Sequence, residues 1–239
     1  MRKQNIGLIA YRLLLVSLLA APIEASIEDY FHLNIPTSSN YGNTGIIELP
    51  NARFMKEGTL KFGYSSSFPN EYTFISASPF PWFEATYRYT EIEDKLYSPS
   101  AAFSGNQSWK DKGFNVKLRL REESYHLPAV AIGLRDLAGT GAFSSEYIVA
   151  SKQIGDVDLS LGLGWGYLGQ LKTIKNPLGD ISKSFKTRNS DTGQGGTFNF
   201  QDWFSSDQVS IIGGLEYKLK KQGLRLKLEY DTTKPDVSY

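Results

Sequence analysis

Few residues in this 239-residue sequence have the types and spacing that chemistry requires. The two histidines, His32 and His126, are far apart, and there is no cysteine, so neither a histidine metal site nor thiolate chemistry is expected. The neighbouring carboxylates Glu122 and Glu123 fall in a short connection, where we expect them to be solvated. The stretch 139–141, Gly-Thr-Gly, lacks the rest of a phosphate-binding pattern and is interpreted as a turn. We therefore predict no catalytic residue, no metal and no cofactor.

Charged side chains on predicted strands are the better candidates for a functional surface. By alternation, ten basic residues share faces with five acidic ones, Glu84, Glu146, Asp158, Glu216 and Glu229. A modestly cationic interior would favour an anionic polysaccharide. The simpler interpretation is that these charges pair across strands in a wet lumen. The candidate polysaccharide contacts are Arg88, Lys117, Arg119, Arg121, Arg135, Arg225 and Lys227.

These side chains must be positioned by strands, because apolar residues recur with a period of two almost throughout. In the clearest run, Leu159, Leu161 and Leu163 alternate with small or polar residues, and the run ends in Trp165 and Tyr167. A transmembrane strand needs about 9–11 residues and commonly ends in aromatic residues. Nine strands are predicted, at residues 60–65, 72–78, 83–90, 114–121, 129–135, 144–153, 157–167, 209–219 and 224–231.

The connections between these strands alternate in length. Both long connections, at residues 91–113 and 168–208, fall in the same alternate set, as in outer-membrane barrels with short turns at the periplasmic end. The second is polar and rich in glycine, which predicts a surface loop or, alternatively, a lumen-folded or polysaccharide-contacting one. Its aromatic residues, Phe198, Phe200, Trp203 and Phe204, suit either an interface belt or a sugar-stacking platform.

The predicted fold is all-β, an antiparallel transmembrane β-barrel of about nine strands. Closed bacterial barrels normally have an even number of strands, and the end of the chain reads as a turn, Lys234-Pro235-Asp236. We therefore expect this chain to be an incomplete part of a larger barrel. Both charged strand faces at 114–121 and 224–231 would be unsuitable for a packed core.

The N-terminus predicts export. Arg2, Lys3 and Arg12 flank a short apolar stretch that leads to small residues at Ala21 and Ala25. We predict a signal peptide at residues 1–25 cleaved after Ala25, a segment at 26–57 that precedes the barrel, and a β-barrel segment at 58–239. An uncleaved anchor is the alternative, although the apolar run is shorter than the roughly 20 residues that span a bilayer. The formal net charge of +1 gives no reason to expect nucleic acid as a partner.

Three stretches resemble one family. Residues 40–53, NYGNTGIIELPNAR, are similar to the N-terminal signature of the YjbH-type exopolysaccharide biosynthesis family. Residues 79–84, PFPWFE, are similar to its tight turn and following strand, and the most specific match runs through 110–114, 127–141 and 143–152. Residues 229–231, EYD, extend the resemblance. It implies an outer-membrane β-barrel encoded beside polysaccharide secretion genes, and no enzymatic residues. Some members are lipoproteins, whereas this sequence has no cysteine for a lipid anchor.

The sequence and the resemblance together predict a non-catalytic outer-membrane protein that assists exopolysaccharide or capsule biosynthesis or export. Outer-membrane lipid is the expected partner, with an anionic polysaccharide and other secretion proteins as further candidates. The alternatives are a general porin-like or structural outer-membrane protein, and a soluble periplasmic sugar-binding β-protein, whose apolar strand faces would have to be buried.

Overall fold

The computed structural model describes residues 35–189, 196 and 200–233. The chain divides into two compact units, described separately below: residues 36–217 with 227–239, and residues 1–35 with 218–226. The predicted signal peptide at residues 1–25, its cleavage after Ala25, and His32 lie outside the described residues.

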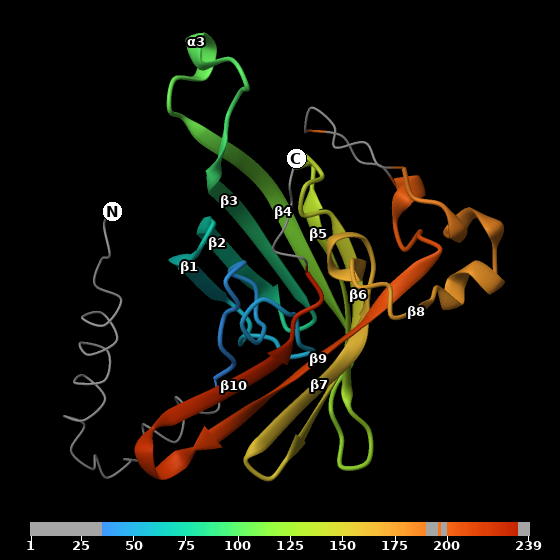
Figure 1. Cartoon of the computed structure of the whole chain (residues 1–239). Helices are drawn as coiled ribbons and strands as arrows, with labels where there is room; N and C mark the ends of the chain where they lie inside the picture. Colours follow the sequence, from blue (N-terminus) through green and yellow to red (C-terminus); the bar gives the residue numbers. More distant parts are fainter. Residues whose placement is uncertain (1–34, 190–195, 197–199, 234–239) are drawn as a thin grey trace, which may run out of the picture. The chain divides into compact units, whose positions relative to one another are not determined.

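Strands make up most of the larger unit (Figure 1). They are β1 (Thr59–Ser67), β2 (Asn70–Phe80), β3 (Phe83–Leu96), β4 (Ser108–Arg121), β5 (Ala129–Leu137), β6 (Ser145–Ile154), β7 (Val157–Gly164) and β8 (Ile174–Lys175). Two more, β9 (Gln208–Leu219) and β10 (Leu224–Tyr230), each extend into the smaller unit. A strand is present at each of the nine predicted places. The predicted aromatic end of the strand at 157–167 was wrong, because β7 ends at Gly164, Trp165 is 2% exposed and Tyr167 belongs to a 3₁₀ helix at Gly166–Gly169. The predicted count is one short because β8, with two residues, is too brief to give an alternating pattern.

The ten strands form one antiparallel sheet in the order β1-β2-β3-β4-β5-β6-β7-β9-β10, with β8 paired to β9. In the described part of the chain β1 and β10 are not paired with each other, so the sheet is not closed into a barrel. The all-β antiparallel prediction is confirmed at this level. No helix among the described residues is long and apolar enough to cross a membrane.

The long connections lie at the same end of the sheet, as predicted, because antiparallel strands reverse direction at each connection. The β3–β4 connection contains α3 (Ala101–Ser104). The β7–β9 connection contains β8 and four 3₁₀ helices, η1 (Gly166–Gly169), η2 (Pro177–Asp180), η3 (Lys183–Lys186) and η4 (Phe200–Asp202). We call this the loop end. The opposite end, with two-residue connections between β2 and β3 and between β6 and β7, is the turn end.

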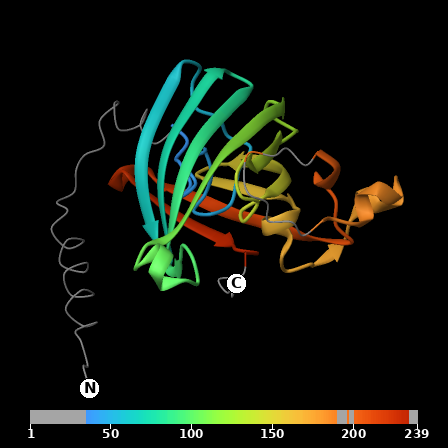
Figure 2. The same ribbon diagram turned by 90° about the horizontal axis from the view of Figure 1, so that it is seen from above.

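The segment at residues 36–57 has no strand of its own and packs on one face of the sheet (Figures 1 and 2). We call this the inner face and the other the outer face. Leu49, Ala52 and Phe54 of the segment share one hydrophobic cluster with residues of β5, β6 and β9, and Tyr41 joins a second cluster with Tyr72. The hydrophobic core of the larger unit therefore lies between this segment and the sheet.

The smaller unit, in its described part, is a hairpin tip. It comprises the last two residues of β9, the 3₁₀ helix η5 (Lys220–Gln222) and the start of β10. The guanidinium of Arg225 donates to the backbone carbonyl of Ile35 at 2.7 Å.

Candidate functional site

Charged side chains of the inner face hold the backbone of residues 36–57. The Glu84 carboxylate accepts hydrogen bonds from the backbone N–H of Thr44 at 2.5 Å and from its hydroxyl at 2.6 Å. Lys117, opposite Glu84 in the β3–β4 register, donates to the carbonyls of Thr44 at 2.9 Å and Arg53 at 2.6 Å, and pairs with Glu84 at 3.6 Å. Both side chains are at most 1% exposed. Two opposite charges are thus buried with their hydrogen-bonding groups satisfied, as burial of charge requires.

Glu229 of β10 binds three successive backbone amides of the same segment. Its carboxylate accepts from the N–H groups of Ile47, Glu48 and Leu49 at 2.9, 2.8 and 3.1 Å. Lys227, two residues earlier on the strand, donates to the Ile46 carbonyl at 2.5 Å. A carboxylate that accepts several backbone N–H bonds forms strong, charge-assisted hydrogen bonds, so this contact fixes the turn at 46–49.

Arg135 lies beneath the turn and is 2% exposed. It donates to the Glu48 carbonyl at 2.8 Å, and its guanidinium lies 4.3 Å from the ring centroid of Tyr41. Within the described residues its Nε and Nη1 atoms have no hydrogen-bond partner, so the aromatic contact supplies part of their stabilisation. Burial raises the pKa of the neighbouring Glu48 carboxyl to about 7, opposed by a hydrogen bond from Asn40 and by the charge of Arg135.

A third buried group holds the β5–β6 connection. Arg88 is fully buried and pairs with Asp111 at 2.7 Å and Asp136 at 3.2 Å. Asp111 also accepts from the backbone N–H and hydroxyl of Thr140, and Asp136 accepts from the N–H of Phe143. The interpretation of residues 139–141 as a turn is therefore confirmed, and its polar groups are satisfied by strand carboxylates.

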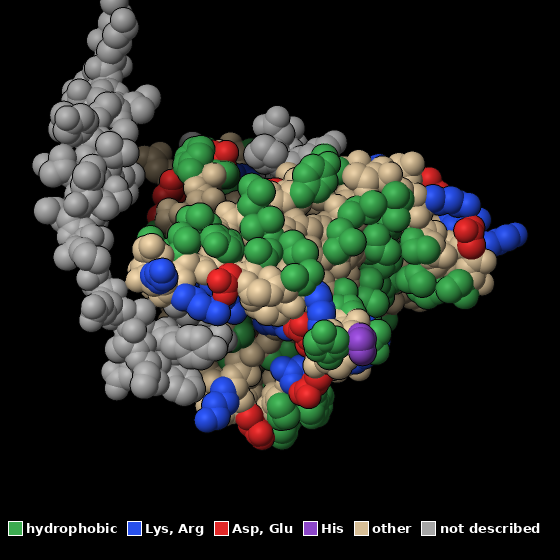
Figure 3. All heavy atoms as spheres, turned by 90° about the horizontal axis from the view of Figure 1, so that it is seen from below, with side chains coloured by type: hydrophobic (Ala, Val, Ile, Leu, Met, Phe, Trp, Pro, Cys, Tyr) green, Lys and Arg blue, Asp and Glu red, His purple; other side chains and the backbone are tan. Residues whose placement is uncertain are grey.

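The outer face is apolar and exposed, as Figure 3 shows for the surface seen from below. Exposed large hydrophobic residues of the larger unit include Leu60, Phe62, Tyr64, Ile75, Tyr87, Phe114, Leu118, Leu120, Leu159, Leu161, Ile211, Tyr217, Leu228 and Tyr230. Phe62 is 85% exposed and Leu161 64%, whereas the charged residues Arg88 and Lys117 on the inner face are 0% and 1% exposed. The expectation that a packed core would not tolerate the charged face at 114–121 was wrong for Lys117, because backbone groups of residues 36–57 satisfy it.

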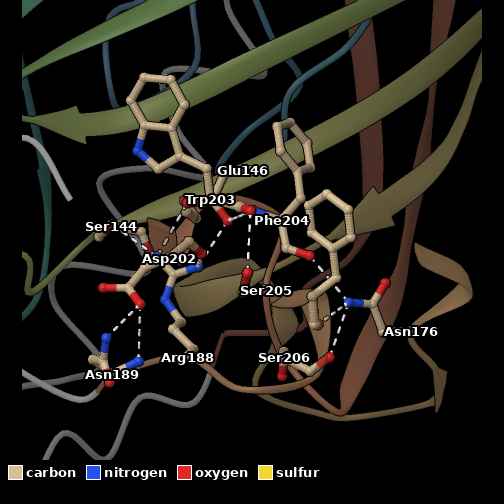
Figure 4. Close-up of polar contacts among 12 residues, drawn as sticks. Ser144, Glu146, Asn176, Arg188, Asn189, Asp202, Trp203, Phe204, Ser205 and Ser206 are labelled. Atoms are coloured by element: carbon tan, nitrogen blue, oxygen red, sulfur yellow. Dashed lines mark hydrogen bonds and ion pairs between the residues drawn. The ribbon is translucent and has the colours of Figure 1, made fainter. Parts of the chain in front are cut away.

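Part of the β7–β9 connection, around Arg188, lies against Glu146 of β6 (Figure 4). Arg188 binds the Glu146 carboxylate through two hydrogen bonds of 2.7 and 3.1 Å, and Glu146 also accepts from the N–H of Phe204 at 2.9 Å. Glu146 alternates with the inner-face residue Tyr147 and is paired with Leu134 in the register. Counting Glu146 among the inner charges was therefore wrong. The same holds for Lys152, one of the ten basic residues counted there, because it lies on the same face of β6 as Glu146.

The same connection is held by its own polar side chains. The Asn176 amide donates to the carbonyls of Phe185, Phe204 and Ser206 at 2.9 to 3.0 Å, and Asp202 accepts two hydrogen bonds from Asn189 (Figure 4). Around Asn176 and Arg188 the connection is therefore a surface loop held by its own hydrogen bonds. Its start packs against the inner face, because Leu168 of η1 is 0% exposed and shares a hydrophobic cluster with Leu49 and Ala52. Of its predicted aromatic platform, Phe198 lies outside the described residues, while Phe200 and Trp203 pack edge to face at 4.7 Å.

The seven predicted polysaccharide contacts separate into three groups. Arg88, Lys117 and Arg135 are buried and bonded to other parts of the protein. Lys227 is partly buried against residue 46. Arg119 is partly exposed, lies 4.7 Å from the centroid of the Phe54 ring and pairs with Glu122. Arg121 is exposed and donates to a carbonyl in the β4–β5 connection. Arg225 belongs to the smaller unit. Contact with a polysaccharide stays a prediction for all seven.

The residues that sequence reasoning missed are the partners of these charges. Glu84 and Glu229 appeared only as counter-charges, and Thr44 had no assigned role. These carboxylates bind backbone N–H groups, and a pattern of side chains does not indicate which N–H groups a carboxylate will bind. One signal was present: the stretches at 40–53 and 229–231 both resemble the same family, and Glu229 binds residues of the first stretch.

A cavity of about 210 Å³ opens at the loop end of the larger unit. Its wall is formed by the β1–β2 turn, the end of β3, and residues that follow β5, β7 and β10. Aromatic rings of Tyr72, Phe143 and Tyr167 line it together with the carboxylates of Glu48 and Asp231. We call it the rim cavity. Groups of three or more potential metal ligands are absent from the described residues.

Comparison with known proteins decides the family. The family described as "Exopolysaccharide biosynthesis protein YbjH" matches residues 37–235. The chain belongs to this family. A relative from Escherichia coli (strain K12), "Uncharacterized lipoprotein YjbH", is 45% identical over 219 residues, which cover 91% of this chain and 31% of the relative. This chain therefore spans less than a third of that YjbH relative. No solved structure matches. The predicted resemblance to the YjbH family is confirmed.

Proposed function

We propose that this chain forms part of a non-catalytic outer-membrane protein that assists exopolysaccharide biosynthesis or export. Membership of the exopolysaccharide family supports the biosynthetic role. The word lipoprotein in the relative's name supports export and membrane association. Outer-membrane lipid, a polysaccharide and other secretion proteins are the proposed partners.

The observation that carries the proposal is the polarity of the sheet. Its outer face exposes a band of Leu, Phe and Tyr side chains, while its inner face buries Arg88, Lys117 and Glu84. Soluble proteins rarely expose contiguous apolar patches of more than a few hundred Å². Strands with an apolar outward face and a polar interior are typical of outer-membrane barrels, and β1, β2 and β6 have 9, 11 and 10 residues, the length that spans a bilayer.

The alternatives are weaker for a specific reason. A soluble periplasmic sugar-binding protein would have to bury Phe62 and Leu161, which are mostly exposed in the described structure. A general porin needs a wet, open interior, whereas residues 36–57 occupy the inner face with their backbone bonded to strand charges. Assistance of polysaccharide export, with the long connections outside the cell, fits both observations.

The test is fractionation of Gram-negative cells that express the whole chain, followed by trypsin treatment of intact cells. Lys183 and Lys186, exposed in η3 at the loop end, should be cut from outside. Lys56, exposed at the turn end, should be cut only after the outer membrane is opened. The double variant Lys183→Gln, Lys186→Gln is the matched control for the assigned cleavage site.

Recovery in the outer membrane with outside cleavage at η3 is the expected result. Recovery as a soluble periplasmic protein would sink the proposal and favour the sugar-binding alternative. Cleavage at Lys56 but not at η3 in intact cells would reverse the proposed orientation.

A further inference from the structure

The rim cavity has a position and a lining that the proposed function does not use. It lies at the loop end, where the β1–β2 turn approaches the end of β3 and residues that follow β10. Under the proposed orientation this end faces the cell exterior, where a polysaccharide would be found. The cavity belongs entirely to the larger unit.

Aromatic side chains form one part of its wall. Tyr72 and Phe143 are buried at 1% and 3% exposure, and Tyr167 packs edge to face on Phe143 with 5.3 Å between ring centroids. These rings are fixed by packing: Tyr72 also lies 5.0 Å from Tyr41. Rigid aromatic surfaces at the edge of water suit ligands that have one apolar and one polar side, as the C–H and hydroxyl faces of a pyranose do.

Polar groups form much of the rest of the wall, and the charged ones among them are mostly acidic. Among the described residues that line the cavity, the acidic ones are Glu48, Asp94 and Asp231, and Lys95 is the one cation. The Lys95 ammonium lies 4.4 Å from the Trp109 ring, which gives it a partner outside the carboxylates. An ionised carboxylate only accepts hydrogen bonds, so an acidic wall suits hydroxyl and ammonium donors and repels other carboxylates. Glu48 adds less to this negative charge, because burial raises its pKa to about 7.

We propose that the rim cavity binds a non-acidic pyranose unit of a saccharide chain, with the partly exposed ring of Tyr167 against the sugar and Asp94 and Asp231 accepting from its hydroxyl or amino groups. The buried rings of Tyr72 and Phe143 lie behind this contact and fix the wall. This inference rests on the proposed function, because it names the part of the polysaccharide that this site would recognise. It also differs from the preference for an anionic polymer predicted from the strand charges. Three of those cations, Arg88, Lys117 and Arg135, are already bonded within the protein.

The experiment measures binding of three defined probes to the folded full chain in detergent micelles: maltohexaose, a glucosamine hexamer and a mannuronate hexamer. Titration calorimetry gives the affinities. We expect the glucosamine probe to bind most tightly, maltohexaose next, and the mannuronate probe at least about tenfold more weakly than glucosamine, since one charge-assisted contact accounts for about that factor.

Two variants assign the binding to this cavity. Asp94 is exposed at its rim, so Asp94→Lys should preserve the fold, weaken glucosamine binding about tenfold and raise mannuronate binding. Glu57→Lys is the matched control, because Glu57 is exposed at the turn end and the same charge reversal there should change neither affinity. Tyr167→Ala should weaken all saccharide binding, and Tyr125→Ala, at the turn end, should weaken none.

Mannuronate binding equal to or tighter than glucosamine binding would overturn the inference, and so would an absence of binding by all three probes. Equal effects of Asp94→Lys and Glu57→Lys on saccharide affinity would show that the rim cavity is not the binding site. Insertion into lipid vesicles is measured on the same preparation. A chain that inserts but binds no probe defeats this inference alone, whereas a chain that stays soluble defeats the proposed function.

Discussion

The two faces of the sheet differ in which side chains they bury: the inner face buries charged ones, and the outer face leaves apolar ones exposed. The inner face buries Glu84, Lys117 and Arg135 and satisfies them with backbone groups of residues 36–57. The outer face exposes apolar side chains along most strands and buries a charge, Glu146, only where the β7–β9 connection covers it. The sheet thus has a polar side closed by its own chain and an apolar side left open.

This difference indicates how each face of the sheet contributes to stability. On the inner face a short segment, rich in turns, neutralises charges from β3, β4, β5 and β10, so one lost contact leaves a buried charge with no route to water. On the outer face the Arg188 side chain is 19% exposed, so we expect the connection around it to open locally and let water reach Glu146. We therefore expect global effects from inner-face substitutions and local ones from the connection.

The largest effect should come from Glu84→Gln. It leaves the Lys117 ammonium, 1% exposed, without its counter-charge, and removal of one partner of a buried pair costs about 3–5 kcal/mol. The measurement is urea unfolding of the detergent-folded chain followed by heat-modifiable gel mobility. The double variant Glu84→Gln, Lys117→Met should recover part of the loss. A single variant as stable as the parent would show that the pair does not hold residues 36–57.

A charge on the outer face should have the next largest effect. Leu161 lies in the middle of β7 and is 64% exposed, so Leu161→Arg would cost little in water but about 2–4 kcal/mol near the midplane of a bilayer. Folding into vesicles measures this cost. Asp156→Arg, in the β6–β7 turn, is the control and should fold as the parent does. Equal folding yields for both variants would mean that the outer face does not meet lipid.

The sequence predicts the part of this contrast that comes from side-chain patterns in the strands, and not the part that comes from contacts with backbone groups. Leu159 and Leu161 alternate with small and polar residues, and period-two patterns of this kind predicted the places of nine strands, although β7 ends at Gly164, before the predicted aromatic residues. The position of residues 36–57 was not predictable, because the contacts of Glu84 and Glu229 are with backbone N–H groups that every residue except proline possesses. Gly42 carries a partial signal. Its φ is +87°, a value that favours glycine. A Cβ atom at this position would lie 2.2 Å from the Phe74 ring, so there is no room for a side chain.

The stability of the folded chain should depend on pH through Glu48, which lies in the segment that covers the inner face. The pKa of Glu48 is raised from 4.5 to about 7, chiefly by burial, with Glu229 and Asp231 adding to the rise and Asn40 and Arg135 opposing it. The folded state therefore holds the proton more tightly than the unfolded state does. This contribution is fully present below pH 4.5 and is lost as the pH rises through about 7, a change of up to about 3 kcal/mol.

Glu48→Gln should remove that part of the pH dependence and make the chain more stable than the parent at pH 8. Urea unfolding at a series of pH values from 5 to 8 measures the difference between the two proteins. Glu57→Gln, at an exposed position, is the control and should follow the parent curve. Identical curves for the parent and Glu48→Gln would mean that Glu48 is already ionised in the folded protein.

The smallest global effect should come from Arg188→Ala. Arg188 binds the buried Glu146 through two hydrogen bonds, but the connection around it can open and return Glu146 to water, which limits the loss to the free energy of local opening. We expect global unfolding to change by less than about 1 kcal/mol, while trypsin cleavage at Lys183 and Lys186 becomes about tenfold faster. Lys175→Ala removes only the exposed pair with Asp180 and should change neither quantity measurably. If Arg188→Ala instead unfolded the whole sheet, the outer connection would stabilise the fold as the inner segment does, and the contrast between the two faces would fail.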